Sequence, residues 1–274
     1  MTVTAARSRT PGFSADDVAA ASWLATAMLG QFGFFVYLAG FYATPLLFGD
    51  VMTWNRNPIL VRPPVESGEA LHTLAFGIHA IGAGIIAVLG GIQLIPGVRR
   101  RFAAFHRWNG RVFVGLVVAL SLSGYYLTWI RGPVPDSLNE LATSVNGLMI
   151  LSFAGLAVRA AMRRRFDEHQ RWAVRLFLVS NAQWFLRIGG FGYFLVAQSI
   201  GAEVSFESGF FKFWTWGCFL VPIVVAELHR RSRDHRAGWI RWSGIAMLGA
   251  CTVMTFIGSF AFLAFALKLV SQNS

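Results

Sequence analysis

Charged residues are scarce in this sequence, and their scarcity excludes a water-soluble globular fold. Asp, Glu, Lys and Arg make up 14% of the 274 residues, whereas 55% of the residues are hydrophobic and the mean hydropathy is +0.54. A soluble chain of this length cannot hide so much apolar surface, so the composition indicates a lipid bilayer as the solvent. We therefore expect a single compact membrane domain built from helices.

Cysteines are few, and common catalytic motifs are absent. Cys218 and Cys251 fall inside apolar stretches and form neither a metal-binding pair nor a disulfide framework. The sequence has no glycine-rich phosphate loop, no nucleophile elbow, no HExxH motif and no histidine boxes of the desaturase type. These absences argue against nucleotide hydrolases, α/β-hydrolases, zinc proteases and membrane desaturases.

Acidic residues are outnumbered by basic ones, 13 against 24, which gives a formal net charge of +11. In a soluble protein this excess would suggest nucleic-acid binding. Here the arginines gather in short connections between apolar stretches, where they face the anionic headgroups of the cytoplasmic leaflet. The expected partner is therefore the lipid bilayer with its anionic headgroups, and no nucleic acid.

Several apolar stretches are long enough to cross a bilayer, which takes roughly 20 residues per helix. They are residues 22–43, 71–95, 108–130, 141–162, 172–196, 211–228 and 239–269. The predicted fold class is an all-α integral membrane bundle of seven transmembrane helices over residues 22–270, preceded by a cytoplasmic segment at residues 1–21. The first stretch lacks a cleavage site of small residues, so we interpret it as a retained helix.

The distribution of arginine predicts how this bundle is oriented. Arginine clusters lie at positions 99–101, 163–165 and 230–236, and Arg7 and Arg9 precede the first stretch. The intervening connections are poor in basic residues, so the positive-inside rule places the amino terminus in the cytoplasm and the carboxyl terminus outside. We expect this orientation in a bacterial cytoplasmic (inner) membrane.

Polar side chains inside the apolar stretches are the best functional candidates, because they are costly to bury in lipid. His72 and His79 are seven residues apart, about two helical turns, so both project from one face at a separation of roughly 10 Å along the axis. Gln93 extends this face toward the cytoplasm, and Asn146 is a polar residue of the fourth stretch. For His72, which lies near the outer end, a structural role is the simpler interpretation.

A second polar stripe follows the fifth stretch. Ser180, Gln183 and Arg187 recur at helical spacing, and His169 lies five turns before Arg187. Counting residues from the span ends places Arg187 at about the depth of His79. No carboxylate lies at that depth, so Arg187 needs an anion: a lipid phosphate, a cofactor propionate, an anionic substrate, or a glutamate near a span end. Snorkelling toward outer headgroups is the alternative.

His106 and His169 begin the third and fifth stretches on the same side of the membrane. Paired histidines on facing helices hold haem b in membrane proteins, with arginines near the propionates. This pattern predicts a haem iron between His106 and His169, and no other metal site. The candidate propionate partners are Arg107, Arg111, Arg171 and Arg175. Both histidines lie at the membrane edge, so hydrated interface positions are the alternative.

A weak internal repeat surrounds these histidines. Residues 107–113 (RWNGRVF) resemble residues 171–177 (RWAVRLF), and a histidine lies just before each copy. The similarity indicates either two parallel copies of a helical hairpin, or convergent chemistry at two membrane borders where Arg and Trp are favoured anyway.

An ordered set of motifs in the second to fifth stretches is similar to a known family. The motifs are His72, GGIQLIP at 90–96, HRWNGR at 106–111, HQRW at 169–172, Arg175, and Leu186 with Arg187. They resemble the bacterial multi-pass membrane family called domain of unknown function 2306 (DUF2306) over residues 71–196, with Ala173 where the family often has Met. The resemblance implies a multi-pass membrane protein and assigns no activity.

These patterns support three hypotheses about function. The leading one is a membrane redox or cofactor-binding protein that holds haem b or a quinone through His79, His106, His169 and Arg187. The second is a transporter or permease for a small anionic solute. The third is a non-enzymatic assembly factor in which polar stripes hold helices together.

Overall fold

The computed structural model describes residues 14–58, 60, 63–130, 137–205, 208–235 and 237–272, and all regular structure within them is helical. Arg7, Arg9 and Arg236, which entered the predicted orientation, lie outside these residues. The elements are α1 (Ala15–Leu38), the π-helix η1 (Ala39–Ala43), α2 (Thr44–Leu47), the 3₁₀-helix η2 (Val51–Arg56), α3 (Ala70–Leu94), α4 (Pro96–Arg101), α5 (Ala103–Tyr125), the π-helix η3 (Tyr126–Ile130), α6 (Ser137–Met162), α7 (Phe166–Ser180), α8 (Ala182–Ser199), α9 (Gly209–Arg233) and α10 (Gly238–Ser271). The expected all-α architecture is confirmed.

Six helices in the described part of the chain are long and apolar enough to cross a membrane. They are Ala15–Leu47, Ala70–Leu94, Ala103–Ile130, Leu138–Met162, Gly209–Arg233 and Gly238–Ser271. Each contains one of the predicted stretches or most of it. The expected multi-pass membrane protein is therefore confirmed, with candidate spans for six of the seven predicted stretches.

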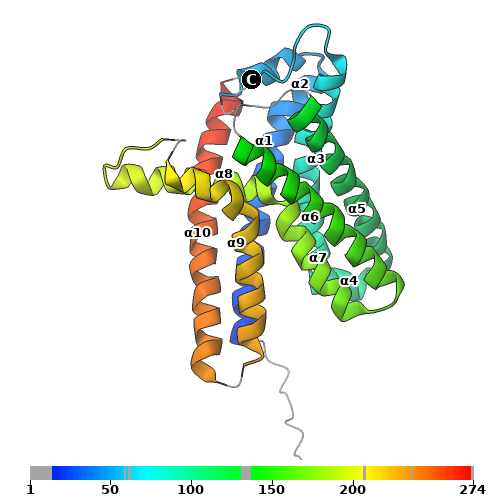
Figure 1. The fold of residues 1–274 in the computed structure, drawn as a ribbon, viewed down its shortest axis with the longest axis vertical. Helices are drawn as coiled ribbons and strands as arrows, with labels where there is room; N and C mark the ends of the chain where they lie inside the picture. The colour runs from blue at the N-terminus through cyan, green and yellow to red at the C-terminus, as the bar shows by residue number, and fades with distance from the viewer. Residues whose placement is uncertain are drawn as a thin grey trace, which may run out of the picture.

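The fifth predicted stretch, 172–196, is divided into two helices. α7 ends at Ser180 and α8 begins at Ala182, and the backbone of Asn181 between them leaves the helical region (φ −98°, ψ 14°). The buried Asn181 side chain donates a hydrogen bond from Nδ2 to the carbonyl oxygen of Phe177 at 2.8 Å. Such a local side-chain bond competes with the helical ladder. Figure 1 shows the result, in which α8 runs across α10 instead of continuing α7.

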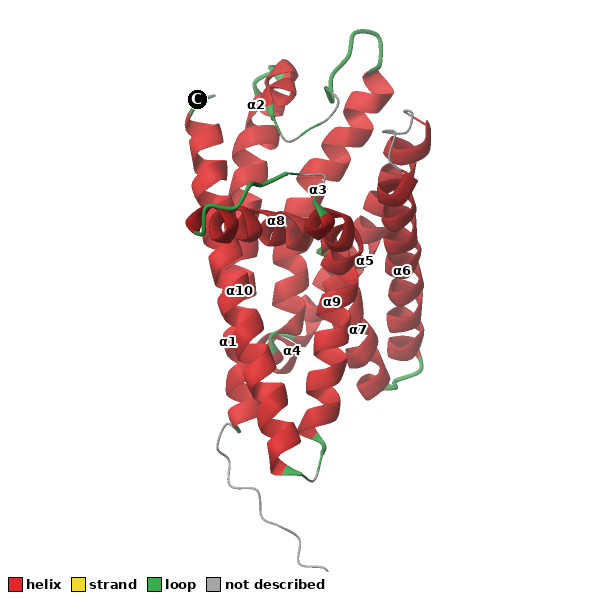
Figure 2. Ribbon diagram, turned by 60° about the vertical axis from the view of Figure 1, so that its left-hand side comes forward, coloured by secondary structure: helices red, strands yellow, loops and turns green. Residues whose placement is uncertain are grey.

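The remaining long helices run between the two ends of the bundle. α1 packs against α3 and α10, α3 against α5, α6 against α7, and α8 against α10 and α9. Figures 1 and 2 show that α1 begins at one end of the bundle and α10 ends at the other. In Figure 2 the helix α4 and the connections α6–α7 and α9–α10 lie toward the end where α1 begins, so the described arginine clusters share one side.

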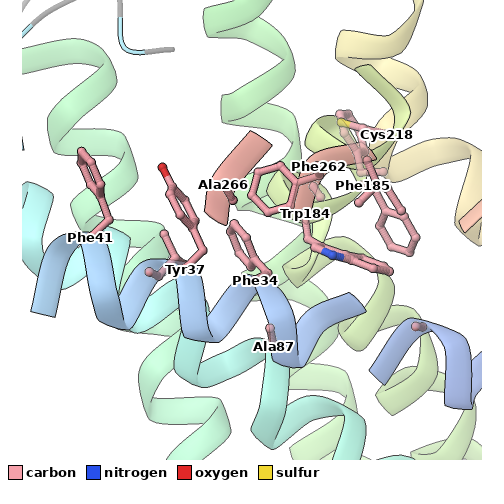
Figure 3. Packing of buried hydrophobic residues seen from close by; sticks show 14 of the residues in the cluster. Phe34, Tyr37, Phe41, Ala87, Trp184, Phe185, Cys218, Phe262 and Ala266 are labelled. Atoms are coloured by element: carbon pink, nitrogen blue, oxygen red, sulfur yellow. The ribbon is translucent and has the colours of Figure 1, made fainter. Parts of the chain in front are cut away.

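Aromatic packing joins α1, α8 and α10 (Figure 3). Phe262 of α10 is fully buried and meets the rings of Phe34 and Tyr37 of α1 edge-on, with centroid distances of 5.7 and 5.5 Å. Trp184 and Phe185, in the first turn of α8, are buried in the same cluster. Edge-to-face contacts favour aromatic pairs, and close packing holds helices together in lipid. The start of α8 is therefore fixed inside the bundle.

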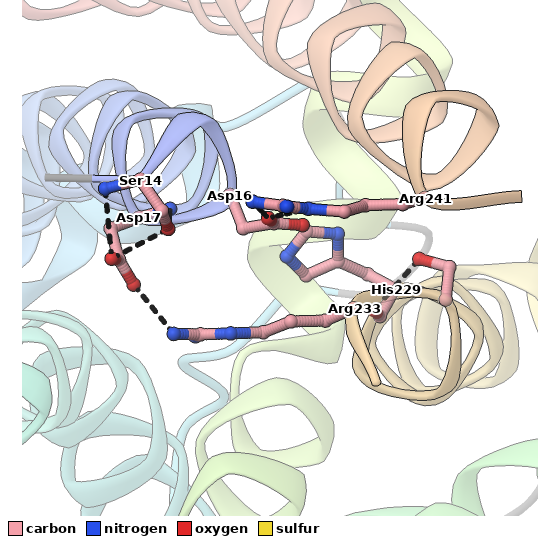
Figure 4. Close-up of polar contacts among 7 residues, drawn as sticks. Ser14, Asp16, Asp17, His229, Arg233 and Arg241 are labelled. Carbon is pink, nitrogen blue, oxygen red and sulfur yellow. Dashed lines mark hydrogen bonds and ion pairs between the residues drawn. The ribbon is translucent and has the colours of Figure 1, made fainter. Parts of the chain in front are cut away.

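Ion pairs fasten the first turn of α1 to the α9–α10 hairpin (Figure 4). Ser14 caps α1 and forms a capping box with Asp17. Asp17 also pairs with Arg233 of α9 at 2.8 Å, and the buried Asp16 accepts a hydrogen bond from Nε of Arg241 in α10 at 2.6 Å. These contacts hold three helices together at the arginine-rich end.

Candidate functional site

A small, partly open cavity lies where α3, α5 and α6 meet the junction between α7 and α8. Its volume is about 80 Å³. Its polar lining residues come from all five helices: His79, Ser121, Tyr125, Thr143, Asn146, Ser180 and Gln183. Four of these, His79, Asn146, Ser180 and Gln183, were singled out from the sequence as buried polar residues. The helix break at Asn181 adjoins this cavity, because Ser180 and Gln183 on either side of it are lining residues. Non-helical backbone within a membrane is tolerated where it lines a cavity.

His79 is oriented by the neighbouring helix α5. Its Nδ1 lies 3.1 Å from the carbonyl oxygen of Leu120 and 3.1 Å from Oγ of Ser123. A carbonyl can only accept, so we assign the ring proton to Nδ1. Nε2 makes no hydrogen bond to any described residue and is the ring nitrogen left for a ligand or water.

Arg187 lies on α8, one turn after Gln183. Its Nη1 donates to the carbonyl oxygen of Gln183 at 2.8 Å and to the side-chain Oε1 of Gln183 at 3.1 Å, and the guanidinium stands 5.5 Å from the centre of the Phe34 ring. Because Gln183 lines the cavity, Arg187 lies at its edge.

No carboxylate pairs with Arg187 in the part of the chain that the structure describes. Of the glutamates near the outer span ends, Glu69 instead contacts Nδ1 of His72 at 2.6 Å, and Glu140 makes no ion pair with Arg187. Asn146 contributes a second unsatisfied group, because its buried Oδ1 has no hydrogen-bond partner among the described residues. The cavity lining therefore includes a free imidazole nitrogen and an amide oxygen without a partner among the described residues, and a cation lies at the cavity edge.

Sequence reasoning missed three cavity residues, Ser121, Tyr125 and Thr143. Ser121 and Tyr125 are four residues apart on α5 and so share a face, as do Thr143 and Asn146 on α6 at a spacing of three. This spacing is the signal that would have found them. The hydroxyl of Tyr125 donates to the carbonyl oxygen of Ser144 at 2.7 Å and so links α5 to α6.

Two candidates from the α3 stripe lie elsewhere. His72 is near the start of α3, paired with Glu69 and 5.4 Å from the ring of Tyr126. Gln93 is near the end of α3, where its Nε2 donates to the carbonyl oxygen of His106 at 2.9 Å and fastens α3 to α5. His72, His79 and Gln93 therefore lie in three separate environments along α3 and do not form one site.

His106, in the first turn of α5, and His169, in the first turn of α7, lie at the arginine-rich end of the bundle. Nδ1 of His106 is buried and has no hydrogen-bond partner in the part of the chain that the structure describes, whereas Nδ1 of His169 is 2.9 Å from the carbonyl oxygen of Ala157. The described residues contain no group of three or more His, Cys, Asp or Glu that could hold a metal ion.

The two arginine motifs beside these histidines share one local geometry. Arg111 stacks on Trp108 at 4.9 Å, and Arg175 stacks on Trp172 at 4.7 Å. Arg175 also donates to Oε2 of Glu227 in α9 at 3.2 Å. The other two candidate propionate partners, Arg107 and Arg171, are exposed. The stacking supports a common local structure for the two motifs, although among the described residues only the Arg175 motif is joined to another helix by its arginine.

A family model described as "Predicted membrane protein (DUF2306)" matches residues 76–229, more than half of the chain. The chain belongs to the DUF2306 family. In this DUF2306 protein the matched range runs from α3 into α9 and contains every residue that lines the cavity. No curated protein and no solved structure matches the chain. The family therefore supports the membrane architecture, and the function has to be argued from the site.

Proposed function

We propose that this protein binds a small anion in the cavity between α3, α5, α6 and the α7–α8 junction and carries it across the membrane. The observation that supports this most strongly is the unpaired guanidinium of Arg187 at the cavity edge. An ionised side chain in a membrane bundle is costly unless a counter-charge accompanies it. With no protein carboxylate paired to it, a bound anion is the natural partner for Arg187.

The break at Asn181 supports the same proposal. α8 starts at Ala182, so Gln183 is in its first turn and also lines the cavity. The first turn of a helix carries the positive end of the helix dipole, which favours anions. Interrupted helices that point such ends at a solute near the membrane midplane are a common construction in secondary transporters.

The size of the cavity indicates which ligands fit. Sites for drug-sized ligands usually exceed roughly 300 Å³, whereas this cavity has about 80 Å³. A few waters or one small anion such as chloride, formate, acetate, bicarbonate or phosphate suit this volume better than a haem or a quinone. The polar lining offers donors to an anion from Nε2 of His79 when the ring is protonated, and from the amides of Asn146 and Gln183.

The orientation completes the proposal. We propose that the arginine-rich end faces the cytoplasm of a bacterium and its anionic inner-leaflet lipids, with the amino terminus inside and the carboxyl terminus outside. The opposite placement of the start of α1 and the end of α10 supports an odd number of membrane passages. We further propose that α7 and α8 together stand in place of the remaining span of a seven-span arrangement.

Thermal unfolding of the purified protein tests anion binding directly. Sodium chloride, formate, acetate, bicarbonate and phosphate are compared at constant ionic strength with sodium gluconate, whose anion is too large for the cavity. We expect at least one small anion to raise the Tm of the natural protein and to lose this effect in Arg187→Gln. The matched control is Arg100→Gln, because Arg100 is exposed on α4 and should leave the shift intact.

Transport is then measured as uptake of the stabilising anion into proteoliposomes. Uptake that disappears in Arg187→Gln and His79→Ala but persists in Arg100→Gln supports the proposal. Equal anion shifts in all variants, or no shift at all, would overturn it and favour the interpretation in which the polar residues only hold helices together, as in an assembly factor.

Haem b at His106 and His169 is a second candidate, supported by the buried Nδ1 of His106, which has no hydrogen-bond partner among the described residues. In this arrangement both rings would ligate one iron, and the stacked Arg111 and Arg175 are described candidates for partners of its propionates. The protein expressed with ample haem precursor should then show a Soret band that His106→Ala and His169→Ala each remove. A colourless protein would exclude this candidate without affecting the anion site.

A further inference from the structure

A second hollow lies on the outer faces of α5 and α6, apart from the cavity around His79. It is an open groove of about 790 Å³. Its walls are apolar side chains of both helices, among them Val114 and Val118 of α5 and Leu151 and Val158 of α6. At Gly155, which also lines the groove, an added Cβ would meet no atom within 4 Å. The groove is therefore open enough to take a hydrocarbon chain.

One end of this groove is cationic. Arg159, in the last turn of α6, and Arg163, just after the end of α6, both line it and lie four residues apart at the arginine-rich end of the bundle. Neither forms an ion pair with a described carboxylate, unlike Arg165, which lies 3.5 Å from Glu168, and Arg230, which lies 2.6 Å from Glu227. Two adjacent guanidinium groups are thus left for a ligand with a negative charge.

We propose that this groove binds an anionic phospholipid of the cytoplasmic leaflet, with an acyl chain along α5 and α6 and the phosphate at Arg159 and Arg163. The groove is apolar along its length and basic at one end, which matches the distribution of polarity in such a lipid. Basic pockets between transmembrane helices on the cytoplasmic side commonly bind anionic headgroups. The proposal does not depend on the anion cavity, because the two sites share no lining residue.

Native mass spectrometry of the full-length protein with added phosphatidylglycerol or phosphatidylcholine tests the proposal. The natural protein should retain phosphatidylglycerol in preference to phosphatidylcholine. In the double variant Arg159→Gln/Arg163→Gln, the ratio of phosphatidylglycerol affinity to phosphatidylcholine affinity should fall by about thirty-fold. The matched control Arg100→Gln/Arg101→Gln removes two exposed arginines from α4 at the same end of the bundle and should keep the preference.

A second variant tests the groove separately from its charge. Gly155→Phe fills the open part of the groove, and we expect it to weaken phosphatidylglycerol binding while both arginines remain. Unchanged lipid binding in Arg159→Gln/Arg163→Gln, or unchanged binding in Gly155→Phe, would overturn the proposal. A thermal shift by inorganic phosphate equal to that by phosphatidylglycerol, and dependent on the same arginines, would also overturn it, because the ligand would then be a free anion.

Discussion

Gly258 of α10 lies directly against the backbone carbonyl group of Ile188 in α8. A Cβ at position 258 would overlap that carbonyl group, and a Cβ at Gly192 of α8 would stand 3.4 Å from the Cα of Gly258. The two helix backbones therefore touch where they cross, as helices in membranes do at small residues. This contact fixes α8 across the bundle, and Arg187, the residue before Ile188, is held at the cavity as a consequence.

Gly258→Ala is expected to destabilise the protein by about 1–3 kcal/mol, because the backbone of α8 has to move to admit the methyl group. The measurement is thermal unfolding in detergent. Gly249→Ala is the matched control on the same helix, since a Cβ there would meet nothing within 4 Å. It should leave stability unchanged or slightly increased, because Ala favours a helix over Gly. Equal unfolding temperatures for the two variants would contradict the close crossing.

Gln183→Glu is expected to remove the anion dependence of the unfolding temperature. Oε1 of Gln183 is 3.1 Å from Nη1 of Arg187, so a glutamate of nearly the same shape would supply the missing counter-charge within the helix. Without added anion the variant should be more stable than the natural protein by roughly 0.5–1 kcal/mol. Anion titrations followed by thermal unfolding measure both effects.

The control for this substitution is Gln198→Glu, which adds the same charge at an exposed position near the end of α8. It should retain the full anion effect. If Gln183→Glu responds to anions as strongly as Gln198→Glu does, Arg187 is not the group that binds them.

Arg241→Gln is expected to destabilise the protein by about 3–5 kcal/mol, because it leaves the carboxylate of Asp16 buried without its cation. The side chain of Asp16 is 1% exposed, and its Oδ1 has no hydrogen-bond partner among the described residues. Adding Asp16→Asn to Arg241→Gln should recover part of the loss. Arg233→Gln should cost less, because its partner Asp17 is 38% exposed. Chemical unfolding of these three variants and the natural protein checks the order.

Hydropathy was sufficient to predict six helices that are long and apolar enough to cross a membrane, because bilayer thickness alone fixes the length of an apolar helix. The break in the fifth stretch was not predictable in this way. Asn181 is neither Gly nor Pro, and its effect depends on a hydrogen bond to Phe177 and on the packing that buries both residues. A window of hydropathy contains no information about that packing.

Residue counting also placed His79 and Arg187 at similar depth, and the structure locates one in the cavity and the other at its edge. The contributions of α5 were missed because Ser121 and Tyr125 are uncharged and are not costly enough to stand out in an apolar helix. The site was also hard to predict because the sequence alone does not show which helix faces meet. Only the structure shows that α5, α6 and α8 converge at the cavity. Charged or ionisable residues in an apolar helix are thus easier to recognise as site candidates from the sequence than residues with a hydroxyl group.

The two arginine motifs make a last prediction, because they share a stacking geometry but differ in one contact. Arg111→Gln removes only the stacking on Trp108 at an exposed site and should cost about 1 kcal/mol or less. Arg175→Gln removes the equivalent stacking on Trp172 and also the hydrogen bond to Glu227 of α9, so we expect a loss of about 2 kcal/mol. Thermal unfolding of the two variants measures the difference. The additional loss in Arg175→Gln should vanish when Glu227→Gln is the background, and its persistence there would mean that Arg175 stabilises the bundle by some contact other than Glu227.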